Sequence, residues 1–205
     1  LIGMPIKILK SDRYYNAMRN LGGEGGSYYK RHLVPFGEYA PFRTLLKPFV
    51  DSLGVPMSDF TAGGAAKPLL KVNGYMAGIS ICYEDAFGEE MIQAMPDAAF
   101  LINASNDGWF GDSFAPYQHQ EIARMRALEN SRYLIRSTNT GGSSVIGPDG
   151  RVLAEAPMFE QQVLIAQLAP LKGTTFYSRV GNRLIVVVLL LLLLVAWLNS
   201  IRRMS

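Results

Sequence analysis

The stretch from Gly74 to Ala104 constrains the fold of this chain more than any other. Two apolar runs, Gly74 to Ile81 and Ala98 to Ala104, predict buried strands, and Glu84 to Met95 between them predicts a helix. Such a unit is almost always a right-handed crossover that leaves its two strands parallel. The sequence therefore predicts an α/β fold around a parallel pair of strands.

The only cysteine of the chain, Cys82, lies at the corner between the first of these strands and the predicted helix. A thiol at this corner feels the positive end of the helix dipole, which favours the thiolate by ~0.3–1 kcal/mol. The adjacent carboxylates of Glu84 and Asp85 oppose the thiolate, so a reactive Cys82 needs a cation from elsewhere in the fold. Taken alone, the position fits a small buried side chain equally well.

The loop after the second strand is rich in hydrogen-bonding side chains, glycines and aromatic rings. It reads Ser105-Asn106-Asp107-Gly108-Trp109-Phe110-Gly111. In a parallel pair this loop and Cys82 emerge at the same edge of the sheet, where α/β folds place their ligands. An ordinary Asx-type turn accounts for Asn106 to Gly108 but poorly for Trp109. We therefore expect a functional site at this edge.

A dense polar and aromatic segment lies upstream and ends in a Pro/Gly loop. It reads Tyr29-Lys30-Arg31-His32-Leu33-Val34-Pro35-Phe36-Gly37-Glu38-Tyr39. Taken alone, Lys30 is best interpreted as a solvated charge and His32 as a structural residue.

The remaining elements complete a mixed α/β domain. We expect a helix over 42–53 that packs on the core or in a membrane interface, an irregular loop over 56–70, and a helix Pro116–Ser131 whose inner face holds Ile122, Met125 and Leu128. Further strands are expected at 1–9 (interrupted at Gly3 to Pro5), 13–21, 27–30, 133–137, 143–146, 151–154 and 163–168.

An unbroken apolar run of fifteen residues, Leu184 to Leu198, lies near the C-terminus. A transmembrane helix needs about 20 residues, and Val180 to Ile201 reaches that length if Arg183 extends to the interface. A buried core helix is the alternative, but a run of six leucines without a polar face argues against it. We expect a catalytic domain over 1–179, a transmembrane helix over 180–201 and a basic tail over 202–205.

Composition narrows the class of partner. The chain is 49% hydrophobic and 18% charged, with a net charge of +3, and no basic run is interleaved with aromatic residues, so nucleic acid is not expected as a partner. One cysteine excludes an internal disulfide and a cysteine-rich zinc site, and we expect no metal or cofactor. Because Leu1 is neither an initiator Met nor part of a signal peptide, we expect a fragment that lacks its N-terminal part.

Five stretches match one family pattern when they are taken together. They are Tyr29–Tyr39, Ile81–Glu84, Ser105–Gly111, Arg124–Glu129 and Arg136–Asn139, and the terminal apolar helix continues the match. This combination resembles the nitrilase superfamily of carbon-nitrogen hydrolases, which use a Glu, Lys and Cys triad. Within it, the chain looks most like the apolipoprotein N-acyltransferase family. The resemblance covers nearly the whole chain.

The resemblance implies a partial four-layer αββα sandwich with Lys30 as the family lysine and Cys82 as the nucleophile. It replaces the interpretation of Lys30 as a solvated charge. Lys30 supplies the cation that Cys82 needs, favouring the thiolate and stabilising an oxyanion, and the N–H after Cys82 is a second donor.

Four further roles follow from the resemblance. Glu84 supports the catalytic pair. Tyr83 and Trp109 line the substrate site, and Glu38 lies on a loop that closes over it.

The family reaction is a two-step acyl transfer on the periplasmic side of the bacterial inner membrane. By the resemblance, Cys82 takes an acyl chain from a phospholipid, typically phosphatidylethanolamine, and forms a thioester. The chain then passes to the α-amine of a diacylglyceryl-cysteine at the N-terminus of an apolipoprotein.

One departure from the family leaves alternatives open. The family's catalytic glutamate lies well upstream of the lysine; no residue here takes its place, and Glu24 in a glycine loop is a poor substitute. We therefore expect this chain alone to be inactive. The alternatives are a membrane-anchored amidase of the nitrilase type and an inactive, membrane-tethered binding domain.

Overall fold

The fold is taken from a computed structural model, which describes residues 1–9, 11, 13–41, 59–140 and 142–204. The helix expected over 42–53 lies outside the described residues.

A six-stranded mixed sheet forms the centre of the domain. Its strands, in spatial order, are β4 (Leu69–Val72), β5 (Tyr75–Ile81), β6 (Phe100–Ser105), β7 (Leu134–Thr138), β8 (Ser144–Ile146) and β9 (Val152–Glu155). β5, β6 and β7 run parallel, and the outer pairs are antiparallel. The predicted parallel pair is thus confirmed. The apolar runs predict it well because the central strands are buried on both faces.

A smaller antiparallel sheet is formed by β1 (Ile2–Lys7), β2 (Tyr14–Arg19) and β3 (Ser27–Tyr29). The predicted interruption at Gly3 to Pro5 is wrong: Pro5 lies within β1, opposite Asn16. A proline is tolerated there because β1 is an edge strand, where a missing N–H breaks few sheet hydrogen bonds.

Two hydrophobic clusters define the layers. Between the sheets, Met18 and Tyr28 of the small sheet pack against a group from the large sheet that includes Ile79, Ile81 and Phe100. On the opposite face of the large sheet, helical residues pack against Leu101, Leu134 and Ile146. The described residues thus form a helix layer and two sheet layers of an α/β fold.

Helix α3 (Ala115–Asn130) covers the large sheet with a different face from the expected one. Its buried residues are Pro116, His119, Ala123, Ala127 and Asn130. Met125 and Leu128, predicted to face inwards, are both 48% exposed. The prediction failed because apolar periodicity assumes large inner side chains. Here two alanines bring the helix close to the sheet, and a histidine and an asparagine are buried beside them.

The segment after Cys82 is not the single helix expected over Glu84 to Met95. It divides into η1 (Cys82–Ala86), α2 (Gly88–Met91) and η2 (Ile92–Ala94). The carboxylates of Glu84 and Asp85 are buried and bound to other segments, which holds η1 in a tight 3₁₀ turn. A dipole argument built on one long helix therefore does not hold for Cys82.

Two predictions made from apolar runs alone need correction. The segment 69–72, expected at the end of a loop, is the edge strand β4, and 163–168, expected as a strand, is irregular. β4 pairs with β5 through a two-residue turn at Asn73 and Gly74, a local signal that the apolar pattern hides.

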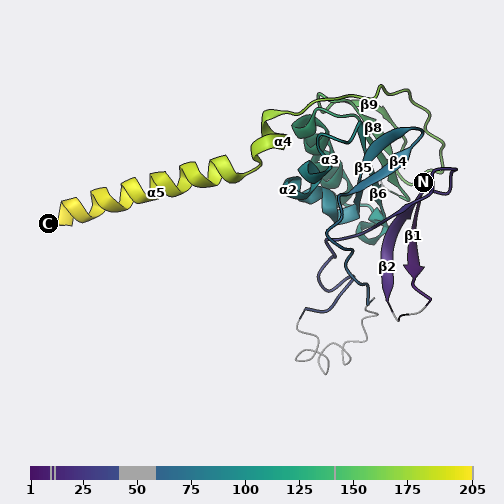
Figure 1. The fold of residues 1–205 in the computed structure, drawn as a ribbon, viewed down its shortest axis with the longest axis horizontal. Coiled ribbons are helices and arrows are strands. Elements are labelled where there is room, and N and C mark those ends of the chain that lie inside the picture. Colours follow the sequence, from purple (N-terminus) through teal and green to yellow (C-terminus); the bar gives the residue numbers. More distant parts are fainter. Residues whose placement is uncertain (10, 12, 42–58, 141, 205) are drawn as a thin grey trace.

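After α4 (Phe176–Val180) the chain ends in α5 (Arg183–Met204), which projects away from the domain (Figure 1). Within α5, the segment Arg183–Arg202 has a mean hydropathy of 2.9, and none of it is buried against the rest of the protein. α5 is therefore a candidate membrane span. The full exposure of this leucine-rich helix argues against the alternative of a core helix.

Candidate active site

Cys82 occupies the turn from β5 into η1 in an unusual backbone conformation. Its φ of 51° lies in the left-handed region, which costs a residue with a Cβ about 1–3 kcal/mol. The side chain is half-buried and the thiol is free. Strain of this kind persists only where the surroundings enforce it, and two groups of buried polar residues do so at Cys82.

The first group centres on the carboxylate of Glu84. Glu84 Oε1 accepts hydrogen bonds from the backbone N–H groups of Arg31 (2.7 Å) and His32 (3.1 Å) and from the Tyr28 hydroxyl (2.8 Å). Glu84 Oε2 accepts one from the Ile81 N–H at 2.8 Å. One buried side chain thus joins the segment after β3 to the corner at Cys82.

Burial raises the pKa of Glu84 above its ordinary value, although these four hydrogen bonds act to lower it. The pKa of the Tyr28 hydroxyl is raised chiefly by burial and to a smaller extent by the negative charge of Glu84. The hydroxyl therefore stays protonated and donates its hydrogen bond to Glu84 Oε1. Glu84 is therefore engaged by structural donors on both oxygens, which fits the predicted supporting role.

Lys30 lies within the segment that Glu84 holds and is 1% exposed. Its Nζ is 2.7 Å from Glu38 Oε2. Glu38 also accepts hydrogen bonds from Asn16 Nδ2 and the Val34 N–H, both at 2.8 Å. Glu38, predicted to bind substrate, thus contacts the lysine directly and fixes the position of the ammonium.

Tyr83, the residue after Cys82, is 39% exposed and belongs to a cluster of three aromatic rings. Its ring meets Phe87 edge-on at a centroid distance of 5.0 Å, and Phe87 stacks on His32 at 3.7 Å. His32 Nδ1 in turn lies 2.7 Å from Glu90 Oε1. His32 is thus a packed structural residue, as its sequence context predicted.

Trp109 lies in η3 (Asp107–Phe110), the short helix that follows β6. Its side chain is 86% exposed, whereas neighbouring Asp107 is 1% exposed. Phe110 and Phe114 are also exposed, at 48% and 84%. The loop therefore turns a carboxylate inwards and an apolar aromatic surface outwards.

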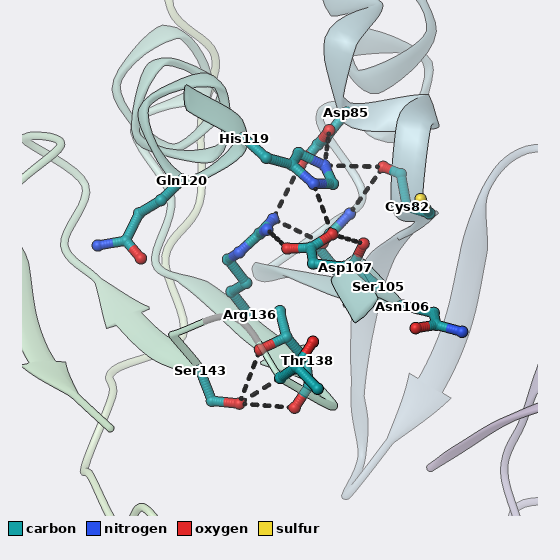
Figure 2. Close-up of polar contacts among 12 residues, drawn as sticks. Cys82, Asp85, Ser105, Asn106, Asp107, His119, Gln120, Arg136, Thr138 and Ser143 are labelled. Atoms are coloured by element: carbon teal, nitrogen blue, oxygen red, sulfur yellow. Dashed lines mark hydrogen bonds and ion pairs between the residues drawn. The ribbon is translucent and has the colours of Figure 1, made fainter. Parts of the chain in front are cut away.

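The second buried group contacts the carbonyl oxygen of Cys82 and joins η1, η3, α3 and β7 (Figure 2). His119 contacts Asp85 and Asp107 through its two ring nitrogens, and Arg136 contacts both carboxylates. Sequence reasoning did not identify His119. The available signal was its spacing of four and eight residues from Ala123 and Ala127, which places it on the small-residue face of α3.

An open hollow of ≈ 390 Å³ adjoins this corner on the side of Arg31. It is lined by Arg31, Gly63, Gly64, Ala65, Glu90 and Gln93. Among the described residues, no group of three or more His, Cys, Asp or Glu side chains is placed to hold a metal ion. The described site thus combines a free thiol, a buried ammonium and buried carboxylates, without a metal-binding cluster.

The Carbon-nitrogen hydrolase family profile matches residues 1–174, and the chain belongs to this family. The fold agrees with solved nitrilase-type structures. A nitrilase-superfamily member from Saccharomyces cerevisiae matches with a TM-score of 0.57 at 23% identity, covering 78% of this chain and 55% of that chain. A carbon-nitrogen hydrolase from Helicobacter pylori gives 0.57 at 20% identity, covering 78% and 57%.

Curated relatives of known name identify a narrower group within the carbon-nitrogen hydrolase family. The chain is 50% identical over 182 residues to the apolipoprotein N-acyltransferase of Methylococcus capsulatus, covering 89% of this chain and 36% of that protein. It is 45% identical over 186 residues to the enzyme of the same name from Nitrosomonas europaea, covering 90% and 37%. The chain thus spans little more than a third of the length of these relatives.

Proposed function

We propose that this chain forms the acyl-transfer site of an apolipoprotein N-acyltransferase. The observation that carries the proposal is Cys82, a free thiol in a strained turn that Glu84 joins to the segment containing Lys30. The chain is also 50% identical over 182 residues to a curated enzyme of this name. The proposed catalytic residues are Cys82 and Lys30, with Glu84 in support.

In the first step the Cys82 thiolate adds to the carbonyl carbon of a phospholipid ester, with phosphatidylethanolamine as the proposed donor. The oxygen that becomes negative is stabilised by the Lys30 ammonium and the N–H of Tyr83. Collapse of the intermediate breaks the ester C–O bond. The proton lost by the thiol ends on the lysophospholipid, and the acyl chain remains on Cys82 as a thioester.

In the second step the α-amine of a diacylglyceryl-cysteine attacks the thioester. The C–S bond breaks, an amide forms, and the amine proton ends on the sulfur of Cys82. A thioester suits this order because it stores the acyl group in a form that an amine can attack.

The exposed features support a reaction at a membrane surface. Trp109 presents an exposed apolar ring at the substrate edge, and Tyr83 lies beside Cys82. Helix α5 anchors the domain, which we place on the periplasmic side. A membrane-impermeant protease added to intact spheroplasts is expected to cut the domain. Protection until the cells are lysed would reverse this placement.

The deciding experiment is an intact-mass measurement on the protein, purified in detergent as its cell makes it and mixed with phosphatidylethanolamine. We expect an added mass of one acyl chain that hydroxylamine removes and that Cys82→Ala lacks. No adduct on the wild-type protein would sink the transferase proposal.

The same acyl-enzyme separates transfer from hydrolysis. With a diacylglyceryl-cysteine peptide present, the adduct is expected to disappear quickly and the peptide to gain the acyl chain. An adduct that decays equally fast in water alone would instead identify a hydrolase of the amidase type.

A further inference from the structure

His119 lies between two buried carboxylates (Figure 2). Its Nδ1 is 3.0 Å from Asp107 Oδ1, and its Nε2 is 2.9 Å from Asp85 Oδ1. A carboxylate oxygen only accepts hydrogen bonds, so each ring nitrogen needs a proton to make its contact favourable. Both contacts exist together only when His119 is the doubly protonated imidazolium.

The charges of the cluster lead to the same conclusion. Arg136 lies 2.5 Å from Asp107 and 3.6 Å from Asp85, and the side chains of Arg136 and both aspartates are 0% exposed. Two carboxylates, one guanidinium and one imidazolium sum to zero, whereas a neutral His119 would leave a buried net charge of −1. Burial alone lowers the pKa of His119, but the hydrogen bonds to Asp107 and Asp85 outweigh it and raise the pKa to about 10.

The cluster also holds the carbonyl oxygen of Cys82. His119 Nε2 lies 3.3 Å from this oxygen and Asn103 Nδ2 lies 3.4 Å from it. Asn103 is itself fixed by contacts with Ser80 Oγ (2.9 Å) and Arg136 (3.2 Å). In Figure 2 the carbonyl oxygen of Cys82 points towards His119, and its sulfur points away.

Because a peptide bond is planar, fixing the carbonyl of Cys82 also fixes the direction of the next N–H group, that of Tyr83. The Cys82–Tyr83 bond is trans, so the carbonyl of Cys82 and the N–H of Tyr83 point in opposite directions in one rigid plane. A carbonyl held in the cluster therefore turns the Tyr83 N–H outwards. Tyr83 lies in the first turn of η1, where the N–H groups have no partner within the helix.

We propose that His119 is a positioning residue that, as an imidazolium between Asp85 and Asp107, fixes the Cys82–Tyr83 peptide plane and aims the Tyr83 N–H at the acyl oxygen. It acts through this peptide and does not touch the substrate. The inference rests on the proposed role of Cys82 as the nucleophile.

Two reactions of the same thiol separate positioning from simple support of the fold. Acylation of Cys82 by p-nitrophenyl butyrate passes through an oxyanion and needs the aimed N–H. Alkylation by iodoacetamide forms an S–C bond as iodide leaves and involves no oxyanion. Both rate constants can be measured on the purified protein in detergent, with Cys82→Ala supplying the background.

His119→Gln is expected to lower the acylation rate constant about 10- to 100-fold and to change alkylation less than about 3-fold. The loss of acylation is smaller than the ~100- to 1,000-fold for outright removal of an oxyanion donor, because the Tyr83 N–H is still present and only loses its fixed direction. Glu121→Gln, on the exposed face of the same helix, is the control and should change neither rate. An equal loss of both rates would overturn the proposal, because it would mean that the corner had collapsed. No loss of acylation would also overturn it.

The wild-type protein provides a test that needs no buried substitution. Both reactions require the thiolate, so the ratio of acylation to alkylation cancels the ionisation of Cys82. The charged groups that face His119 are Asp85, Asp107 and Arg136. We expect the ratio of acylation to alkylation to fall when His119 loses its proton in this surrounding. A ratio that stays constant through that deprotonation would contradict the proposal.

The protonation state can be read from ¹⁵N-histidine NMR spectra, in which His119→Gln assigns the signal. At pH 8, both ring nitrogens of His119 are expected at imidazolium shifts, and a neutral tautomer there would overturn the proposal. The proposal would also be overturned by a wild-type protein that iodoacetamide alkylates but that p-nitrophenyl butyrate does not acylate. A protein acylated by the ester but not by phospholipid would instead refute the proposed function and leave the role of His119 standing.

Discussion

At the scale of single residues, the site depends on carboxylates that bind protein donors. Glu84 accepts four hydrogen bonds from three backbone N–H groups and one tyrosine, at 2.7–3.1 Å. These donors come from two segments far apart in the sequence. The carboxylate therefore sets the position of Cys82 relative to the segment that contains Lys30.

Replacing Glu84 with Gln tests this role. The amide group of Gln would face backbone donors, and each buried donor left unpaired costs about 1–3 kcal/mol. We expect a lower melting temperature in detergent and slower alkylation of Cys82. The matched control is Glu121→Gln, whose side chain is 65% exposed and which should change neither property. Equal melting temperatures for the two variants would show that Glu84 does not hold the corner.

The raised pKa of His119 predicts a pH dependence of stability. Its pKa in the folded protein is about 10 against an ordinary value of 6.5, so the folded state binds the proton more tightly. The resulting stabilisation is complete below pH 6.5 and is lost as the pH rises towards 10. The difference in unfolding midpoint between wild type and His119→Gln should therefore shrink over this range. A difference that grows with pH would contradict the assignment.

At the scale of elements, α3 matters most because it brings His119 to the carbonyl oxygen of Cys82. Ala123 and Ala127 are 0% exposed and pack near Leu101, Leu134 and Ile146 of the sheet. Larger side chains at the two alanines would push the helix away from the sheet. The small-residue face therefore serves both the core and the charge cluster.

The substitution Ala127→Leu is expected to destabilise the domain by about 1–3 kcal/mol through overpacking. It should also slow acylation of Cys82, because His119 moves with the helix. The comparison variant is Met125→Ala on the outer face, for which we expect a change within about 0.5 kcal/mol in urea unfolding. A loss of several kcal/mol for Met125→Ala would place the core face where the apolar pattern predicted it.

At the scale of the whole molecule, the chain between the domain and α5 is tied to the domain. The N–H of Leu171 donates to Ala99 O at 3.0 Å, and Arg132 donates to Gly173 O at 2.7 Å. Thr175 Oγ1 donates to Glu129 O at 2.5 Å, and Glu89 accepts from the N–H of Asn182. These contacts continue to the residue before α5, so the connection between the domain and α5 is structured.

The membrane assignment of α5 predicts a strong effect of one central charge. Arg at the centre of a spanning helix costs about 2.5–3.5 kcal/mol of insertion free energy. The segment Arg183–Met204, placed between reporter domains, is expected to insert, and Leu191→Arg should lower the inserted fraction. Leu191→Ala is the control and should insert nearly as well as wild type. Equal insertion of the Arg and Ala variants would argue against a spanning helix.

Several features of this protein can be predicted because they depend on local pattern alone. Apolar runs predict β5, β6 and α5 because a continuous apolar stretch can be recognised without knowing which distant residues it meets. The resemblance at the motifs around Lys30 and Cys82 led to the family. The helix after Cys82 and the inner face of α3 were predicted wrongly, because both depend on what the buried side chains meet.

The way in which the buried charged residues combine depends on the three-dimensional fold. Asp85, Asp107, His119 and Arg136 are up to 51 positions apart in the sequence, and each looks like an ordinary surface charge in its own segment. The parallel crossovers bring their segments to one sheet edge, where burial makes neutrality of the group a requirement. The protonation of His119 and the orientation of the Cys82 peptide follow from that long-range assembly, which no local pattern contains.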